Sequence, residues 1–305
     1  ECQCNMDTAM SVLRWLGFTC NQEKTTGPST CLKFIGYEFD TVAGTIAIGD
    51  DRKAELISLL SAATAAKRID TRDLETLIGK LVYTASVMRG GNAFIYRMRV
   101  AHRAAATAGL KHTSLGHEPL ADMTWWLRQL RGPWAGSRMF IKDQNLPILK
   151  MKSDASGGTG PDAATLGWGY QLGRAIHWQR WDPTTAIVTE QHIQWKELLA
   201  ISHVCTEYGH LFANSILRCS VDNSGVQYIV NKLSSSCPTL MHLLRIIADA
   251  QCRHNFDIVA SHVSREFNEL TDCLSRWQVP ADMIPFLPPG VTLPPWLQSL
   301  EPKGA

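Results

Sequence analysis

The stretch LPILKMKSDASGGTG, residues 146–160, decides the fold of the C-terminal half. Its apolar beginning predicts a short buried strand, and the strand delivers one carboxylate, Asp154. Residues 155–158 are all small and keep bulk away from this acid. The stretch alone leaves two interpretations open. Asp154 ends a strand and starts a turn, or it binds a metal ion that needs open space for a substrate.

Length and composition predict about two folded domains in a reducing compartment. The chain has 305 residues, of which 45% are hydrophobic and 19% charged, so it can bury real cores. Its nine cysteines are scattered without a repeated CxxC spacing, which argues against a disulfide framework and a structural zinc site. No apolar run reaches the length of a membrane span and no signal peptide opens the chain. We therefore expect an intracellular protein, cytoplasmic or nuclear, without a membrane partner.

Basic charge is concentrated in the middle third of the chain. The net charge is only +2, but residues 51–150 carry roughly +8 and each flank about −3. Such a region is either a solvated face or a surface that binds a polyanion. The basic side chains that we expect to follow the phosphates of a nucleic acid are Arg89, Arg97, Arg99, Arg103 and Lys111.

The C-terminal half predicts an α/β domain over residues 146–278. The order of its patterns is β-β-β-α-β-α-α-β-α. The expected strands are residues 148–155, 165–172, 174–181, 215–223 and 256–263, and the expected helices are residues 190–212, 223–232, 238–255 and 268–277. Residues 279–305 are rich in proline and predict an extended tail.

The N-terminal half predicts a hairpin and a mainly helical domain. Residues 32–39 and 41–49 read as two strands joined by a turn, within a first segment over residues 1–44. Residues 45–140 are mostly helical, and Thr71 is the expected N-cap of one helix. The tryptophans of this domain, Trp125, Trp126 and Trp134, are expected to pack in the core rather than stack on bases.

Four acidic residues of the C-terminal half lie where a carboxylate is costly: Asp154, Glu197, Asp222 and Asp272. A buried carboxylate must be paired, hydrogen-bonded or metal-bound, and no lysine or arginine lies beside all four as an obvious partner. Each acid taken singly also has an ordinary explanation. Asp222 would cap a helix, Glu197 would be half exposed, and Asp272 would lie on a solvated face.

Taken together, the four acids predict a metal site. Asp154 and Asp222 each end a strand, and parallel neighbouring strands would bring both ends to one edge of the sheet. Helices carrying Glu197 and Asp272 would complete the cluster over this edge. Carboxylates that lie so close together repel one another, so we expect two Mg²⁺ ions to bind between them, with Mn²⁺ as the alternative. Two such ions support in-line attack on a phosphodiester.

Four segments in this order carry a family resemblance: SDAS…GWGY, HIQWKELLA, CSVDNSG and HVSREFNELTDCLSRW. Together they resemble the RNase H domain of a retroelement polyprotein, most closely the DIRS-type (tyrosine-recombinase) group. The resemblance covers about residues 146–277. It implies a five-stranded mixed sheet flanked by helices, and cleavage of the RNA strand of an RNA–DNA hybrid. Integrases share this fold, but their third acid is a late Glu, so the order Asp-Glu-Asp-Asp disfavours them.

The resemblance also implies roles for single residues. By position, the four acids would be the metal ligands, and His262 would match a mobile histidine near the leaving group; otherwise it is a surface loop histidine. Asn223 and Ser224 would lie near the substrate backbone. The chain departs from the family pattern in Thr271, where alanine is usual, and in Cys273, to which we assign no role.

The N-terminal half resembles a reverse transcriptase just past its catalytic centre. LGFTCNQEKT followed by FIGYEFD would be the end of the palm with a primer-grip hairpin, and the helices after it the thumb and connection. The paired aspartates of a polymerase centre are expected upstream of Glu1, in a longer polyprotein whose palm segment would be a partner. Asp50 and Asp51 run straight into an amphipathic helix, so they suit a helix N-terminus rather than a polymerase centre.

These patterns leave three hypotheses. The first is a Mg²⁺-dependent RNase H attached to a reverse-transcriptase thumb, which does not polymerise DNA alone. The second is a catalytically inactive remnant that binds nucleic acid or acts as a scaffold. The third is a subunit of a split polymerase.

Overall fold

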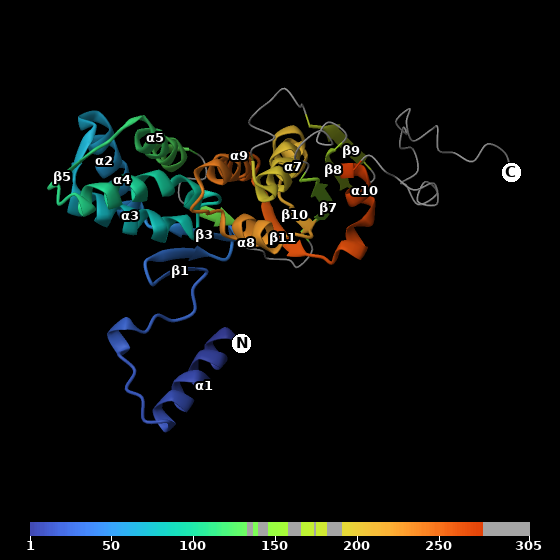
Figure 1. Ribbon diagram of the computed structural model, residues 1–305. Helices are drawn as coiled ribbons and strands as arrows, with labels where there is room; N and C mark the ends of the chain where they lie inside the picture. The colour runs from blue at the N-terminus through green and yellow to red at the C-terminus, as the bar shows by residue number, and fades with distance from the viewer. Residues whose placement is uncertain (133–136, 140–145, 158–165, 174, 182–190, 277–305) are drawn as a thin grey trace, which may run out of the picture.

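The computed structural model describes residues 1–132, 137–139, 146–157, 166–173, 175–181 and 191–276 (Figure 1). Trp134 and the proline-rich segment 279–305 lie outside these residues. Within the described ranges no helix is both long and apolar enough to cross a membrane. All nine cysteines are described and none is in a disulfide, as expected from their spacing.

The C-terminal half is an α/β unit built on a five-stranded mixed sheet, which confirms the predicted fold class. The strand order is β11-β10-β7-β8-β9. Strand β10 runs parallel to both β7 and β11, whereas β8 and β9 add antiparallel strands on the other side of β7. The strands are β7 (Ile148–Ala155), β8 (Gly167–Leu172), β9 (Ala175–Arg180), β10 (Ile216–Val221) and β11 (Asp257–His262).

Helices cover both faces of this sheet. They are α7 (Ile193–Tyr208), α8 (Ser224–Lys232), α9 (Pro238–His254) and α10 (Glu269–Arg276). On β8, the rings of Trp168 and Tyr170 contact His203 of α7. Gly169 between them faces α10, where an added Cβ would lie only 2.8 Å from the Cβ of Leu274. Because neighbouring residues of a strand face opposite ways, α7 and α10 cover opposite faces.

The preceding part is mainly helical. Its helices are α2 (Asp50–Ala66), α3 (Thr71–Ala85), α4 (Tyr96–Thr107) and α5 (His117–Arg131), with a short 3-10 helix at Gly91–Phe94. Trp126 of α5 is buried and donates from Nε1 to the carbonyl of Phe94 at 3.0 Å. Trp125 is buried beside it, in a stacked contact with the Phe94 ring. Both tryptophans therefore pack in the core, as predicted.

The prediction of one strand over residues 32–39 is wrong. The segment forms two strands, β1 (Cys31–Phe34) and β2 (Tyr37–Asp40), joined by a turn at Ile35 and Gly36, where φ is 43° and 82°. A continuous apolar and aromatic pattern hides this turn, but glycine adopts positive φ without strain. Strand β3 (Thr45–Ile48) then pairs with β2, and β6 (Ser137–Met139) with β3, so the expected hairpin is a four-stranded antiparallel sheet.

The N-cap of α3 differs from the sequence prediction. Asp70, not Thr71, is the N-cap of α3, and its side chain accepts from the backbone N–H of Arg72 at 2.9 Å. The hydroxyl of Thr71 instead donates to the carbonyl of Leu110. The two segments meet here because β4 (Arg68–Asp70) pairs with β5 (His112–Ser114) in a small sheet, which the sequence patterns did not predict.

Two acidic residues at the start of α2 suit the helix, not a polymerase centre. Asp50 and Asp51 occupy its first turn, where negative charge interacts favourably with the exposed N–H groups. The first helix, α1 (Cys2–Trp15), buries no residue and stands apart from the other elements (Figure 1).

The helical part and the α/β unit meet along α9. Arg89 forms an ion pair with Asp257, the first residue of β11, at 3.1 Å. The Tyr96 hydroxyl donates to the carbonyl of Ser236 at 2.9 Å. Gly90, at φ 74°, lies so close to α9 that an added Cβ would be 2.6 Å from the Ala248 carbonyl oxygen. This position therefore requires glycine both for its φ and for space.

Candidate active site

Asp154 and Asp222 lie side by side at one edge of the five-stranded sheet. The parallel register pairs Lys152 of β7 with Ser220 of β10. Asp154 comes two residues after the first and Asp222 two residues after the second, so the two acids leave the sheet at the same level. This is the edge where parallel strands end, and where open α/β sheets commonly place their ligands.

Asp154 is a buried carboxylate with one hydroxyl partner. Only 5% of the residue is exposed, and its Oδ2 accepts from the Ser275 hydroxyl of α10 at 2.7 Å. Burial raises the pKa of the Asp154 carboxyl to about 6; the charges of Asp222 and Asp272 act in the same direction, while the Ser275 hydrogen bond opposes them.

Glu197 reaches the same edge from α7. It is also 5% exposed, and its Oε1 accepts from the Asn223 side-chain amide at 3.1 Å. Burial raises the pKa of the Glu197 carboxyl to about 8; the charges of Asp222 and Asp154 add to the effect, and the Asn223 hydrogen bond opposes it. The interpretation of Glu197 as a half-exposed helix residue is therefore wrong.

Asp272 of α10 differs from the other acids because two arginines hold it. Arg265 donates to both of its carboxylate oxygens, at 2.9 and 3.1 Å, and Arg276 donates to Oδ1 at 3.0 Å. The hydrogen bond and charge of Asp272 are the main causes that raise the pKa of Arg265, and the charges of Asp154 and Asp222 contribute. The sequence suggested no obvious basic partner for the acids, so this pairing corrects that expectation for Asp272.

The four acids form one electrostatically coupled cluster, which we call the carboxylate edge. Among the described residues, however, no three His, Cys, Asp or Glu side chains are arranged to hold a metal ion. Repulsion is relieved by the high pKa values of Asp154 and Glu197 and by the arginines on Asp272. The expected divalent cation therefore stays a prediction, and in its absence protonation and the two arginines reduce the repulsion.

The donor set of the carboxylate edge nevertheless fits Mg²⁺. It offers hard carboxylate oxygens from two strand ends and two helices, the type of ligand that Mg²⁺ prefers. Within the described segments Asp154 and Glu197 take part in no ion pair, so both stay available to a cation that displaces their protons.

Three further predicted residues surround Asp222. His262, the last residue of β11, is exposed, and its Nε2 lies 3.1 Å from the Asp222 carbonyl oxygen. Asn223 is the N-cap of α8, since its Oδ1 accepts from the N–H groups of Gly225 and Val226 while its amide holds Glu197. Ser224 is exposed at the first position of α8.

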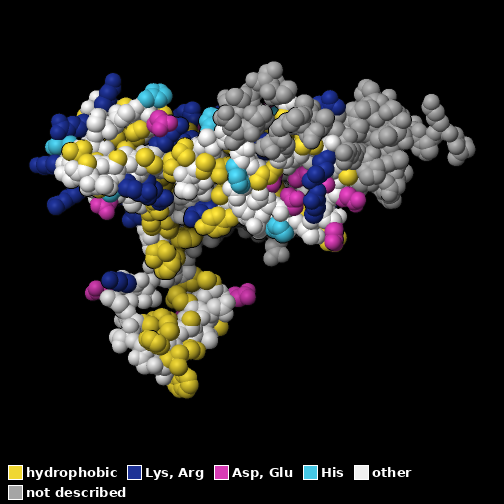
Figure 2. Space-filling view, viewed as in Figure 1, with side chains coloured by type: hydrophobic (Ala, Val, Ile, Leu, Met, Phe, Trp, Pro, Cys, Tyr) yellow, Lys and Arg dark blue, Asp and Glu magenta, His cyan; other side chains and the backbone are white. Residues whose placement is uncertain are grey.

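The basic residues predicted to bind nucleic acid fall into two groups. Arg99, Arg103 and Lys111 are exposed on and just after α4. Arg89 and Arg97 instead have carboxylate partners: Arg89 pairs with Asp257, and Arg97 with Glu118 and Asp122. Figure 2 shows Lys and Arg side chains gathered over the helical part, and Asp and Glu side chains gathered near α10.

Sequence reasoning missed Ser275, Arg265 and Arg276. A signal for two of them was present, because Ser275 and Arg276 follow Asp272 by three and four residues and so share its side of the helix. Arg265 carries no such signal, since it reaches Asp272 from a separate 3-10 helix, Arg265–Asn268.

Comparison with known proteins yields structural likeness only. No family model and no characterised sequence matches the chain. RNase H1 of the halophilic archaeon Halobacterium salinarum is 15% identical over 42% of this chain and 95% of its own, with a TM-score of 0.31. LC11-RNase H1 in complex with an RNA/DNA hybrid is 15% identical over 43% of this chain and 95% of its own, with a TM-score of 0.35.

A longer structure matches across both halves of the chain. The foamy viral protease-reverse transcriptase in complex with double-stranded DNA is 11% identical, with a TM-score of 0.38. The match covers 85% of this chain, which spans 42% of the viral protein's length. TM-scores of this size carry no functional argument.

Proposed function

We propose that the chain is a Mg²⁺-dependent endonuclease that cleaves the RNA strand of RNA–DNA hybrids. The observation that carries the proposal is the pairing of Asp154 and Asp222 at adjacent parallel strand ends, with Glu197 and Asp272 electrostatically coupled to them. Four acids from four elements have no structural need to meet there, and their mutual repulsion disfavours it. The ordered motifs that resemble a DIRS-type retroelement RNase H support the same reaction.

Each group at the edge would have a distinct role. Asp154, Glu197, Asp222 and Asp272 would hold the cation, which when bound supplies Lewis-acid activation of water and stabilises the leaving oxygen. Asn223 would fix the Glu197 carboxylate through its amide. His262 is exposed beside the Asp222 backbone, where its ring would donate a proton to the leaving oxygen of the cleaved RNA strand.

The domain organisation belongs to the same proposal. Residues 1–44 would be the end of a reverse-transcriptase palm, residues 45–140 a thumb and connection, and residues 146–278 the nuclease. Exposed Arg99, Arg103 and Lys111 would follow the phosphates of the hybrid, whose shape and 2′-hydroxyls would be recognised rather than its sequence. An upstream palm segment would be the partner for polymerisation.

The test is cleavage of a hybrid labelled on the RNA strand, with Mg²⁺ or with EDTA. We expect cleavage of the hybrid only with Mg²⁺, and none of duplex DNA of the same sequence. Asp222→Asn should abolish it, whereas Asp51→Asn, on the exposed start of α2, should leave it unchanged.

One observation favours an inactive nucleic-acid-binding protein instead. Both oxygens of Asp272 are occupied by guanidinium groups, so one of the four ligands is engaged. If the wild-type chain binds the hybrid but leaves it intact at every Mg²⁺ concentration, this second function replaces the first.

A further inference from the structure

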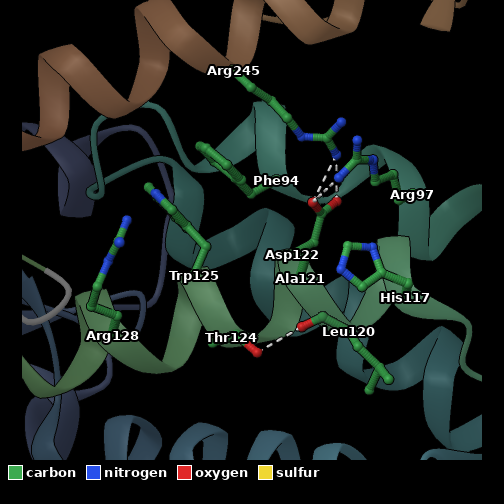
Figure 3. A pocket seen from close by; sticks show the side chains of 10 residues that line it. All are labelled: Phe94, Arg97, His117, Leu120, Ala121, Asp122, Thr124, Trp125, Arg128 and Arg245. Carbon is green, nitrogen blue, oxygen red and sulfur yellow. Dashed lines mark hydrogen bonds and ion pairs between the residues drawn. The ribbon is translucent and has the colours of Figure 1, made fainter.

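A cavity of about 550 Å³ lies where the helical part meets α7 and α9. Its lining is unusually basic, with four arginines and a single carboxylate, that of Asp249. The arginines come from α4, α5 and α9 and are Arg97, Arg128, Arg245 and Arg253. We call this cavity the arginine groove. A neighbouring cavity of about 430 Å³ shares three of these arginines and is shown in Figure 3.

Asp249 cannot neutralise the groove alone. Its carboxylate accepts from Arg128 at 2.9 Å, from Arg253, and from the indole Nε1 of Trp125 at 3.0 Å. One negative charge is thus shared by two guanidinium groups. The side chains of Arg128 and Arg253 are 63% and 66% exposed, so both can be reached by a ligand.

Arg245 provides independent evidence for a ligand. The residue is nine-tenths buried, and its terminal nitrogen donates to both oxygens of Asp122, at 2.8 and 2.6 Å. Its Nε–H has no hydrogen-bond partner anywhere in the described part of the chain. A buried donor left without a partner is costly, and the residue that carries it is one of those that line the groove.

The acids near Arg97 and Arg245 do not line this cavity. Figure 3 shows Arg245 descending from α9 and Arg97 approaching from α4, with Asp122 between them. Glu118, 67% exposed, is a second partner of Arg97 at 3.2 Å. Neither carboxylate belongs to the groove lining, but both neutralise part of the charge of Arg97 and Arg245. The open positive charge of the groove is therefore mainly that of Arg128 and Arg253.

We propose that the arginine groove is a second ligand site, which binds a phosphate ester. Guanidinium groups match the planar pairs of oxygens of a phosphate, and several of them around one cavity favour a multiply charged anion. The stacked rings of Phe94 and Trp125 form an apolar wall, which strengthens charge interactions nearby, and the volume admits a group of nucleotide size.

The groove lies away from the carboxylate edge. Arg253 lies four residues before the start of β11, whereas Asp154 and Asp222 lie where β7 and β10 end. Two sources can supply the phosphate ester: a free nucleotide, or a backbone phosphate of a nucleic-acid strand that passes over the junction.

The test compares variants of opposite sign in EDTA and low salt. Arg253→Gln removes a positive charge and should weaken binding about three-fold, whereas Asp249→Asn removes the one acid of the groove and should tighten it about three-fold. Loss of folding would weaken binding in both, so the opposite signs identify a charge effect. Arg14→Gln on the separate helix α1 is the matched control and should change nothing.

Three probes distinguish the ligand sources. Binding of pyrophosphate and adenosine monophosphate is measured by calorimetry, and binding of a labelled RNA–DNA hybrid by fluorescence anisotropy. If the affinities of the two variants for the small anions change in opposite directions, the ligand is a free phosphate ester. If only their affinities for the hybrid do so, the ligand is a phosphate of a nucleic-acid strand. If neither kind of probe shows opposite shifts, the proposal is wrong. EDTA removes the cation that cleavage needs, so this result is independent of the proposed nuclease.

Discussion

The carboxylate edge and the arginine groove gather charge of opposite sign in one molecule. At the edge there are four acids and two arginines, and both arginines bind Asp272. At the groove, four arginines and Asp249 line one cavity, and Asp122 is not among its lining residues. Burial raises the pKa of Asp122 to about 6 although Arg245 and Arg97 oppose it, and it raises that of Asp154 to the same value although the Ser275 hydroxyl and the Ala155 backbone oppose it.

This difference shows that proximity to an arginine does not by itself make a buried carboxylate acidic. Asp122 is 1% exposed, and loss of water outweighs two guanidinium groups. Asp154 and Glu197 have no such groups and would gain most from an added cation. The groove would gain most from an added anion. The variants below test whether the two regions respond in these opposite ways.

The largest expected effect is on cleavage. Asp222→Asn should lower the cleavage rate of the hybrid about 10³-fold or more, because it removes a charge that would hold the cation. Its melting temperature in EDTA should not fall, since losing one charge relieves repulsion from Asp154 and Glu197. Retained cleavage, or a clear loss of stability without metal, would contradict a catalytic carboxylate edge.

Removing the buried cation at the groove should cost stability instead. Arg245→Gln leaves Asp122 buried with the more distant Arg97, 3.7 Å away, and should lower the free energy of unfolding by about 3 kcal/mol. Chemical denaturation provides the measurement. The double variant with Asp122→Asn should recover part of the loss, and an unchanged stability of the single variant would show that this ion pair is not structural.

The pH dependence of stability distinguishes the edge from an ordinary salt-bridged surface. Folding raises the pKa of Glu197 to about 8 and that of Asp154 to about 6, so the folded state holds more protons than the unfolded state between about pH 4 and 8. Stability in EDTA should therefore fall as the pH rises through this window.

Glu197→Gln is the control for this effect. It removes the group with the higher pKa, so thermal denaturation should show a flatter pH profile, mainly between pH 6 and 8. Added Mg²⁺ should raise the melting temperature of the wild type at pH 8. A wild-type stability that rises with pH over the same window would exclude the assigned protonation states.

A smaller effect is expected when the arginine on Asp272 is removed. Arg265→Gln should tighten Mn²⁺ binding about three-fold in calorimetry, because an exposed guanidinium competes with the ion for the same carboxylate. Arg276→Gln, which keeps Arg265 on Asp272, should change it less. Weaker Mn²⁺ binding by Arg265→Gln would instead identify Arg265 as a residue that positions Asp272.

The smallest effect concerns the helical part. Arg99→Gln with Arg103→Gln should reduce the slope of hybrid affinity against salt by about 1 for each phosphate that the variant no longer binds. Arg89→Gln is the comparison, because Arg89 is held by Asp257 and should leave the slope unchanged. Equal slopes for the wild type and both variants would remove the basic helical surface from the proposed interface.

The sequence predicted the α/β unit well because its strands and helices carry strong local patterns. The expected strand 148–155 is β7, and the expected helix over 223–232 is α8 within one residue. The approach of Asp154 to Asp222 also followed from the order of the elements, since it requires only that the strands be parallel and adjacent. The domain boundaries and the roles of the site residues stay predictions.

What the sequence did not predict depends on contacts between distant residues or on one backbone angle. Arg245 meets Asp122 across more than a hundred residues, and no local pattern announces such a pair. The turn at Ile35 depends on a positive φ that is rare outside glycine. In the sequence nothing distinguishes Arg265 and Arg89 from other arginines, and only the fold shows which carboxylate each one meets.

The hydrogen-bond ladder between β7 and β10 has a consequence for how this chain tolerates change. Side chains alternate between the two faces of a strand, so sliding β10 by a single residue would turn its acid toward the opposite side. A one-residue deletion inside that strand would therefore separate Asp222 from Asp154 in space, although every acidic residue would remain in the sequence. A chain changed in this way would keep all four sequence motifs and differ only in the spacing between them.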